Sequence, residues 1–315
     1  MTTVSLIGFG EAGAILGQDL AALGLKVYAY DRLQETQSTR DAMHIKASQS
    51  RVQLCESITE AIASGDWIIS AVTADCALDV VRTAAPLMKP DQLFIDINSV
   101  APSTKREAFA IMQRYSIGYL EAAVMAPIPP QRLKTPILLG GERAGFVAGQ
   151  MNQLGMNVRP IADEIGIASA IKMCRSIMIK GLEALTTECL STARQYGAEL
   201  EVLSSLHQSF PHMGWNDGLP NYLISRVAEH GRRRSEEMKE VAKTCRDVGV
   251  ASGMSQAIVY AQRNLVDAMI DADVDYKKLE PFDWTSLVDS LYGSPFAREA
   301  SAQVRAAERG SSSEE

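Results

Sequence analysis

The sequence predicts an α/β Rossmann domain with a parallel sheet, followed by an all-α C-terminal domain. Three observations lead to this prediction. A glycine-rich motif directly follows the apolar run 4–7, short apolar runs alternate with helical patterns up to about residue 160, and strand signals disappear from about Asp163 onward. Alternating strands and helices build right-handed crossovers and a parallel sheet covered on both faces. We therefore expect the first domain over residues 1–163 and the helical domain over residues 164–315.

Short apolar runs mark the expected strands of the first domain. They occupy residues 4–8, 26–30, 67–72, 93–98, 117–122 and 136–141. Helices are expected between them, because apolar residues recur there at helical spacing. These segments are 12–24, 76–88, 103–115 and 142–154. In the second domain we expect long helices from Ile165 to about Tyr196 and from Leu223 to Val248.

Composition narrows the possible classes of function. The 315 residues carry 31 Lys and Arg against 38 Asp and Glu, and the net charge of −7 argues against a nucleic-acid or anionic-membrane partner. The five cysteines form no C-x-x-C pair, and the four histidines lack metal-ligand spacing, so we expect reduced thiols and no metal site. Neither a signal peptide nor a transmembrane segment is predicted, which favours a cytoplasmic protein.

The motif Gly8-Phe9-Gly10-Glu11-Ala12-Gly13 follows the first expected strand and opens the first expected helix. In the G-x-G-x-x-G pattern, the first glycine permits the turn and the second lets a pyrophosphate approach the backbone. The third glycine allows the helix to pack closely on the strand. The N-terminus of the helix supplies free N–H groups to the anion. A plain strand-to-helix turn is the alternative interpretation.

Asp31 ends the second expected strand, where a carboxylate accepts hydrogen bonds from the hydroxyls of the adenosine ribose. Strand, glycines, helix, strand and acid in this order predict a dinucleotide-binding site. A carboxylate repels the 2′-phosphate of NADP, so NAD is the favoured cofactor. Arg32 would attract that phosphate or stack on adenine, which leaves NADP open. A solvated turn residue is the alternative for Arg32.

Asn98 and Ser99 follow the expected strand 93–98, on the side of the sheet where ligands bind in such folds. We expect Asn98 to contact the cofactor and Ser99 to contact the substrate. Helix capping before Pro102 is the alternative, because Asn and Ser are both preferred at the first position of a helix.

Three segments resemble the β-hydroxyacid dehydrogenase superfamily, which includes 6-phosphogluconate dehydrogenase-like and 3-hydroxyisobutyrate dehydrogenase-like enzymes. Residues 6–24 resemble its opening motif, residues 166–185 its catalytic helix, and residues 230–250 an uncharacterised helical domain of one branch. The resemblance implies an NAD(P)-dependent oxidoreductase that interconverts a secondary or primary alcohol and its carbonyl by hydride transfer. It also implies that Val72 and Thr73 line the cofactor ribose.

The resemblance further implies that Lys172 is the acid/base at the reacting carbon. A positioned proton acceptor lowers the barrier to hydride departure, and an apolar face can lower the pKa of a lysine. Ser176 lies one helical turn later, where the family commonly has an asparagine that binds the substrate. Lys180 continues this face and either reaches the substrate or pairs with Glu183. A solvated helix lysine is the alternative for Lys172.

The family's substrate loop usually reads as an acid followed by Ala-Pro-Val-Ser-Gly-Gly, whereas the aligned residues here run from Glu121 to Pro127. Met125 replaces the serine, and Pro127 removes an N–H donor. A substrate that is bulkier or less polar than small 3-hydroxy acids fits a wall of this kind. A repacked loop is the alternative.

Other functions and partners remain open at this level. One is imine reductase-like C=N reduction, although relatives of that kind commonly lack the lysine, and another is a non-catalytic dinucleotide-binding assembly protein. A small-molecule substrate is the expected partner. We also expect a homodimer through the helical domain, because its long apolar helices offer more apolar surface than a small domain hides. The Arg232–Arg234 cluster, surrounded by glutamates, favours a helix face laced with salt bridges.

Overall fold

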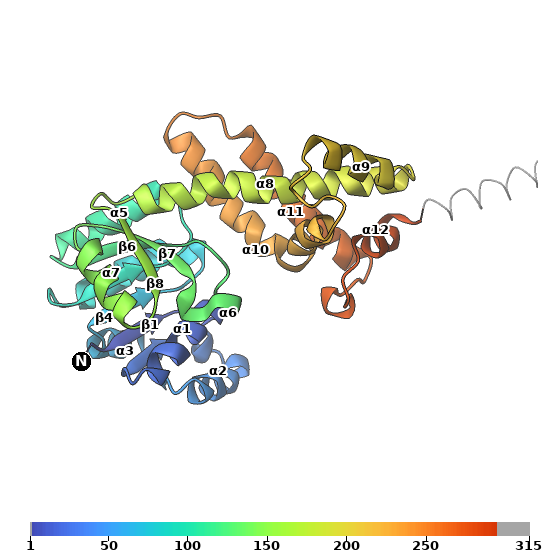
Figure 1. The fold of residues 1–315 in the computed structure, drawn as a ribbon. Helices are drawn as coiled ribbons and strands as arrows, with labels where there is room; N and C mark the ends of the chain where they lie inside the picture. Colours follow the sequence, from blue (N-terminus) through green and yellow to red (C-terminus); the bar gives the residue numbers. More distant parts are fainter. Residues whose placement is uncertain (1, 295–315) are drawn as a thin grey trace, which may run out of the picture. The chain divides into compact units, whose positions relative to one another are not determined.

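The computed structural model describes residues 2–294, and the chain folds as two compact units (Figure 1). The first unit contains the residues up to Arg175 together with residues 243–251. The second contains residues 176–242 and the described residues from Ser252 onward. The division therefore lies inside a long helix, α8 (Ile167–Gln195), whereas the predicted boundary between residues 163 and 164 coincides with the end of the sheet.

The first unit is built on an eight-stranded sheet with the order β3-β2-β1-β4-β5-β6-β7-β8. All neighbouring strands run parallel except β6 and β7, which are antiparallel. The predicted parallel sheet is thus confirmed for β1 to β6 and carries an additional antiparallel edge. The strands are β1 (Val4–Ile7), β2 (Val27–Tyr30), β3 (Gln53–Leu54), β4 (Trp67–Ser70), β5 (Leu93–Asp96), β6 (Gly118–Val124), β7 (Pro136–Gly140) and β8 (Asn157–Ala162).

Helices cover both faces of this sheet. Successive strand residues point to opposite faces, and Leu6 and Ile95 accordingly join one buried cluster while Ile7 and Phe94 join the other. Residues of α1, α2 and α7 complete the first cluster, and residues of α3, α4 and α5 complete the second. The helices are α1 (Glu11–Ala22), α2 (Gln37–Gln49), α3 (Ile58–Ser64), α4 (Ala77–Ala84), α5 (Pro102–Arg114), α6 (Ile128–Gln131) and α7 (Ala144–Gln153).

The described residues of the second unit form helices joined by loops, without a strand, which confirms the predicted all-α domain. Its core lies around Leu190, Val227, Leu265 and Leu287. The helices are the later turns of α8, α9 (Glu199–Ser209), α10 (Leu219–Asp247), α11 (Gly253–Asp271) and α12 (Trp284–Tyr292). Within residues 2–294, no helix combines the length and the apolar character needed to span a bilayer.

Candidate active site

The predicted ligand-binding residues of the first unit gather at one edge of the sheet. Strands β1, β4, β5 and β6 are parallel, so their carboxyl ends meet at the same edge. The chain leaves β1 toward β2 on one side and returns to β4 on the other, which makes this edge a topological switch point. The glycine motif follows β1, Val72 and Thr73 follow β4, Asn98 and Ser99 follow β5, and Met125 follows β6.

The glycine motif contains two glycines that the fold requires and one that it does not. Gly8 has a φ of +96°, and a Cβ there would overlap the carbonyl oxygen of Ala71. A Cβ on Gly13 would overlap the carbonyl oxygen of Gly8. A Cβ on Gly10, in contrast, would meet no protein atom within 4 Å. The packing of the protein therefore does not require a glycine at position 10, and the close approach of a pyrophosphate to Gly10 stays a prediction.

The start of α1 is open to an anion. Its N-cap residue is Gly10, and no side chain caps the first turn. The first N–H groups of a helix have no partner inside the helix and attract negative charge. Glu11 is exposed and Ala12 is half-buried, whereas the Phe9 ring is fully buried in the core. Phe9 can therefore offer a ligand only its backbone.

Asp31 lies beside the glycine motif. Its Oδ2 accepts a hydrogen bond from the backbone N–H of Phe9 at 2.7 Å, and its Oδ1 accepts one from the N–H of Leu33 at 3.0 Å. The two bonds fix the carboxylate at the carboxyl end of β2. Arg32 is exposed next to it. The pKa of Asp75 is lowered, chiefly by a hydrogen bond from the Thr73 side chain and to a small extent by the charge of Arg32.

Lys46 is a residue of this site that the sequence did not indicate. Its Nζ donates to the carbonyl oxygens of Phe9 at 2.8 Å and of Gly10 at 2.9 Å, and it lies 5.4 Å from the centroid of the Phe9 ring. Burial lowers the pKa of Lys46, while the charges of Asp31 and Glu11 act in the opposite direction. Lys46 thus holds the backbone of the motif from the α2 side.

Asn98 joins the ends of two neighbouring strands. Its Oδ1 accepts from the N–H of Val72 at 2.7 Å, and its Nδ2 donates to the hydroxyl of Ser70 at 2.9 Å. The capping alternative is wrong, because the N-cap of α5 is Ala101 and no side chain caps that helix. The contact of Asn98 with a cofactor stays a prediction, as do the contacts of Val72 and Thr73.

Lys172 and Ser99 meet at the same edge of the sheet. The Nζ of Lys172 donates a hydrogen bond to the Oγ of Ser99, although 73 positions separate the two residues in the sequence. Both side chains are half-buried. Lys172 is thus half-buried and hydrogen-bonded, and its role as the acid/base stays a prediction. A lysine and a hydroxyl paired in this way can hold and transfer a proton.

Glu121 fixes the start of the helix that carries Lys172. Its carboxylate is fully buried and accepts from the N–H groups of Gly166 at 2.7 Å and Ala168 at 3.0 Å. It also accepts from the hydroxyl of Ser169 at 2.7 Å and from the Ser169 N–H at 3.2 Å. A negative charge at a helix N-terminus is favourable. β6 therefore anchors α8 close to Lys172.

Met125 directly follows β6, and its side chain is half-buried. It packs against a small buried cluster of Ala123, Leu138 and Ala168, and its N–H donates to the carbonyl of Pro136 at 2.9 Å. Pro127 is exposed and precedes α6. The loop is thus partly occupied by packing, and a role of Met125 in substrate binding stays a prediction.

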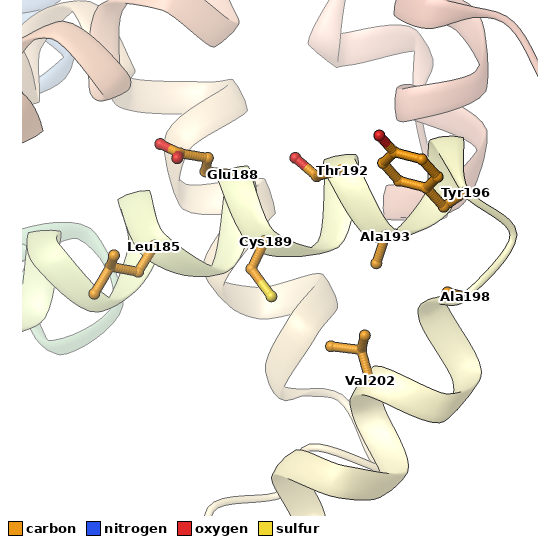
Figure 2. A pocket seen from close by; sticks show the side chains of 8 residues that line it. All are labelled: Leu185, Glu188, Cys189, Thr192, Ala193, Tyr196, Ala198 and Val202. Atoms are coloured by element: carbon orange, nitrogen blue, oxygen red, sulfur yellow. The ribbon is translucent and has the colours of Figure 1, made fainter.

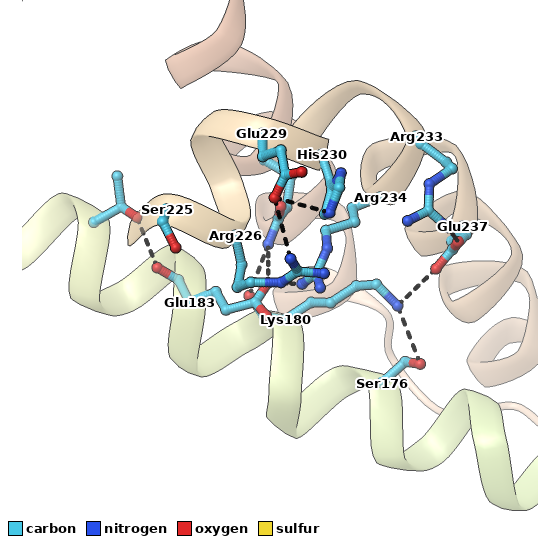
Figure 3. Close-up of polar contacts among 12 residues, drawn as sticks. Ser176, Lys180, Glu183, Ser225, Arg226, Glu229, His230, Arg233, Arg234 and Glu237 are labelled. Atoms are coloured by element: carbon cyan, nitrogen blue, oxygen red, sulfur yellow. Dashed lines mark hydrogen bonds and ion pairs between the residues drawn. The ribbon is translucent and has the colours of Figure 1, made fainter. Parts of the chain in front are cut away.

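Ser176 and Lys180 belong to the second unit, and both are buried (Figure 3). The Nζ of Lys180 lies 2.9 Å from Glu237 Oε2 and 3.3 Å from Ser176 Oγ. The alternative pairing of Lys180 with Glu183 is wrong, because Glu183 pairs with Arg234. A contact of Ser176 or Lys180 with a substrate stays a prediction.

Each arginine of the Arg232–Arg234 cluster forms a salt bridge, as predicted, but only two of the three arginines lie at the surface. Exposed Arg232 pairs with Asp267 at 3.3 Å, and exposed Arg233 pairs with Glu237 at 3.1 Å. Arg234 instead pairs with the buried carboxylate of Glu183, whose side chain also accepts from Gln262 at 3.1 Å. One arginine of the cluster is therefore part of the interior of the second unit (Figure 3).

A shallow hollow of the second unit lies between α8 and α9 (Figure 2). Its surface is mainly apolar, and Leu185 and Tyr196 on its wall are 58% and 83% exposed. The lining residues are Leu185, Glu188, Cys189, Thr192, Ala193, Tyr196, Ala198 and Val202. In the part of the chain that the structure describes, no three His, Cys, Asp or Glu residues are arranged to hold a metal ion.

Comparisons with known proteins agree with this geometry. A family model described as the NAD binding domain of 6-phosphogluconate dehydrogenase matches residues 3–151, and a domain of unknown function, DUF1932, matches residues 193–265. A conserved hypothetical protein from Sinorhizobium meliloti 1021 is 34% identical, with a TM-score of 0.73 over 91% of this chain and 96% of its own.

Two further solved structures share the fold of the chain. A conserved protein of unknown function, reported as similar in structure to 3-hydroxyacid dehydrogenases, is 30% identical, with a TM-score of 0.67 over 85% of this chain and 98% of its own. The 3-hydroxyisobutyrate dehydrogenase of Mycobacterium tuberculosis, solved with L-serine, shares the fold at 16% identity. Its TM-score is 0.67 over 93% of this chain and 99% of its own.

The fold by itself does not identify the bond that is reduced. Imine reductases and reductive aminases share it at 16% to 18% identity. The glycine motif, the open start of α1 and the carboxylate of Asp31 fit a dinucleotide, which matches the family of the first unit. The chain therefore belongs to the β-hydroxyacid dehydrogenase superfamily of NAD(P)-dependent oxidoreductases.

Proposed function

We propose that the protein is a dehydrogenase or reductase that interconverts an alcohol and its carbonyl, with Lys172 as the acid/base. The observation that supports this proposal is the hydrogen bond from Lys172 Nζ to Ser99 Oγ at the carboxyl edge of the sheet. Ligands of such sheets bind at this edge. A proton carrier at the cofactor edge is what alcohol oxidation requires.

The chemistry follows from the two groups. A dinucleotide held by the glycine motif and Asp31 would supply the hydride acceptor for the carbon–hydrogen bond that breaks in the oxidation direction. The O–H bond of the hydroxyl group on the same carbon also breaks. Its proton passes to the neutral amine of Lys172, and the C=O bond forms. Ser99 keeps the lysine nitrogen oriented through its Oγ. In the reduction direction the protonated amine returns the proton to the new alkoxide.

NAD is the cofactor that the first unit favours under this proposal. The Asp31 carboxylate is fixed at the end of β2 by the N–H groups of Phe9 and Leu33, where it would repel a 2′-phosphate. Arg32 is exposed, and Asp75 is the charged residue whose carboxylate it influences.

The substrate is expected to be bulkier or less polar than small 3-hydroxy acids. The loop after β6 presents Met125 and Pro127 in place of a serine and a backbone N–H donor, so it offers little to a substrate carboxylate. A contact of Ser99 with such a substrate is part of the proposal.

The test is a screen of aromatic and aliphatic alcohols, carbonyls and imines with both cofactors, followed by substitution of Lys172. Lys172→Ala should retain the fold and NAD binding, while the rate falls by about 10²–10⁴. Lys172→Arg should not restore the rate, since a guanidinium stays protonated. The pH profile of oxidation should lose its acidic limb in Lys172→Ala. Lys89→Ala, at an exposed lysine of the same unit, is the matched control.

Each result of this test separates the proposal from its rivals. Undiminished turnover by Lys172→Ala would overturn the assignment of the lysine. Reduction of imines without turnover of any alcohol or carbonyl would favour the imine reductase-like alternative. NAD binding without turnover across the whole screen would favour a non-catalytic assembly protein. A preference for the smallest 3-hydroxy acids would remove only the substrate inference.

A further inference from the structure

A fully buried charged network lies directly beneath the turn that carries Ser99. The Nζ of Lys105, on α5, lies 2.8 Å from Asp96 Oδ1, and each side chain is only 1% exposed. The hydroxyl of Tyr119, on β6, donates to the other carboxylate oxygen, Oδ2, at 2.8 Å. Three polar groups from three elements thus converge where β5 ends.

The network acts on the backbone that leads to Ser99. Lys105 Nζ also donates to the carbonyl oxygen of Asp96 at 2.9 Å, and Asp96 Oδ1 accepts from the N–H of Asn98 at 2.9 Å. The side chain of Asn98 then holds Val72 and Ser70 at the end of β4. Asp96 and Asn98, which precede Ser99 in the chain, are therefore both held by hydrogen bonds.

Stability alone is a weak explanation for such a network. Removing two charges from water costs several kcal/mol per ion, and apolar residues of similar volume often replace a buried ion pair with no loss of stability. A buried polar network does, however, impose one geometry on the backbone to which it is bonded. Burial raises the pKa of Tyr119 well above its usual range, and the charge of Asp96 adds to this effect, so the phenol remains a donor.

We propose that Lys105, Asp96 and Tyr119 are positioning residues that hold the turn 97–101 and thereby keep Ser99 Oγ in place to accept from Lys172 Nζ. The catalytic consequence of this inference rests on the function proposed above. A small displacement of a proton-transferring group is costly, because a misplacement of about 1 Å can lower a rate about 10²-fold.

The opposite end of the same strand provides a matched control. Gln92 directly precedes β5, is buried, and donates through Nε2 to the carbonyl oxygens of Ile62 and Gly65, both at 2.6 Å. Its Oε1 accepts from the N–H of Lys89 at 2.8 Å. Gln92→Leu therefore breaks a buried polar network of β5 at the edge away from Lys172.

The first experiment requires no substrate. Acetic anhydride labels neutral lysine amines, and mass spectrometry reports the rate at Lys172 relative to exposed Lys26 over a range of pH. Two variants are compared with the unsubstituted protein, Tyr119→Phe and the charge-neutral double variant Asp96→Asn/Lys105→Met. We expect both variants to change the labelling rate of Lys172, relative to Lys26, by about threefold or more. Gln92→Leu should lower Tm without changing the labelling rate of Lys172.

The second experiment measures turnover with the best substrate of the screen. Tyr119→Phe and the double variant should lower kcat by about 10- to 100-fold, with NAD affinity changed by less than about threefold. Gln92→Leu should leave kcat unchanged. The inference is overturned if both variants label Lys172 as the unsubstituted protein does. It is also overturned if Gln92→Leu changes the profile equally. Absence of turnover in the unsubstituted protein would sink the proposed function, while the labelling would still decide the role of the network.

Discussion

At the residue scale, the three glycines of the motif do not share one physical cause. Gly8 and Gly13 are dictated by the carbonyl groups that lie where their side chains would be, and Gly10 is bare although the space around it is open. The same reasoning separates the backbone of Phe9 from its ring, because the ring belongs to the core and the N–H belongs to Asp31. The contacts that Phe9 can offer to a ligand are therefore those of its backbone.

Substitution of Gly10 tests this account. In Gly10→Val, a branched side chain would enter the space of the pyrophosphate, so we expect NAD affinity to fall by about tenfold or more without loss of the fold. Gly145→Val is the matched control, because a Cβ at Gly145 on α7 also meets no protein atom within 4 Å. Isothermal titration calorimetry measures both. Equal NAD affinity in Gly10→Val and in the unsubstituted protein would refute the pyrophosphate site.

Asp31 is expected to set the choice of cofactor. Asp31→Ala removes the charge that repels a 2′-phosphate and also frees the N–H of Phe9, so NAD should bind about tenfold more weakly while NADP binds equally well or better. Affinities for both cofactors measure the change, with Arg32→Ala as the companion variant. A severalfold preference of the unsubstituted protein for NADP would contradict our interpretation of Asp31.

At the element scale, apolar periodicity predicted most strands of the sheet and the long helix α8. The expected strands at 4–8, 67–72 and 93–98 match β1, β4 and β5, and the long helix expected from Ile165 matches α8. β3 was missed because it has only two residues, and β8 because Asn157, Arg159 and Pro160 interrupt its apolar pattern. α2 was missed because its sequence is polar and only Met43 and Ala47 are buried.

The site was predictable where it rests on local motifs and not where it rests on distant contacts. The glycine motif, Asp31 and Ser99 stand at the ends of recognisable strands, and Lys172 carries a family pattern. Lys46 reaches the motif from a helix that periodicity did not reveal, across 37 positions of sequence. Lys105 looks like an ordinary helix lysine until Asp96 is found against it. Pairings of this kind are decided by tertiary packing.

Glu121 connects two elements, β6 and α8, and its substitution is expected to affect both stability and catalysis. Glu121→Gln removes the charge and one acceptor from the start of α8, which should cost about 1–3 kcal/mol of unfolding free energy and lower kcat. Thermal unfolding and steady-state kinetics measure the two effects. Ser57→Ala, which removes the hydroxyl that caps α3, should lower stability alone. Normal stability in Glu121→Gln would contradict the anchoring role.

At the scale of the whole molecule, the second unit exposes several large apolar side chains. Along α8 and α9, Met178 is 74% exposed, Leu185 58%, Tyr196 83% and Leu200 75%. Leu185 and Tyr196 line the hollow between these helices (Figure 2). Contiguous exposed apolar surface marks protein contacts more often than isolated side chains do. A second copy of the chain is the partner that we propose.

The homodimer is tested by light scattering at micromolar concentration, where we expect twice the mass of the chain. Tyr196→Glu places a charge on this surface, and burying it in an interface would be costly, so the dimer should weaken by at least about tenfold. Phe146→Glu is the matched control, because Phe146 is 64% exposed on α7 of the first unit. The control should remain dimeric. A monomer in the unsubstituted protein, or equal dissociation of both variants, would show that α8 and α9 do not form the interface.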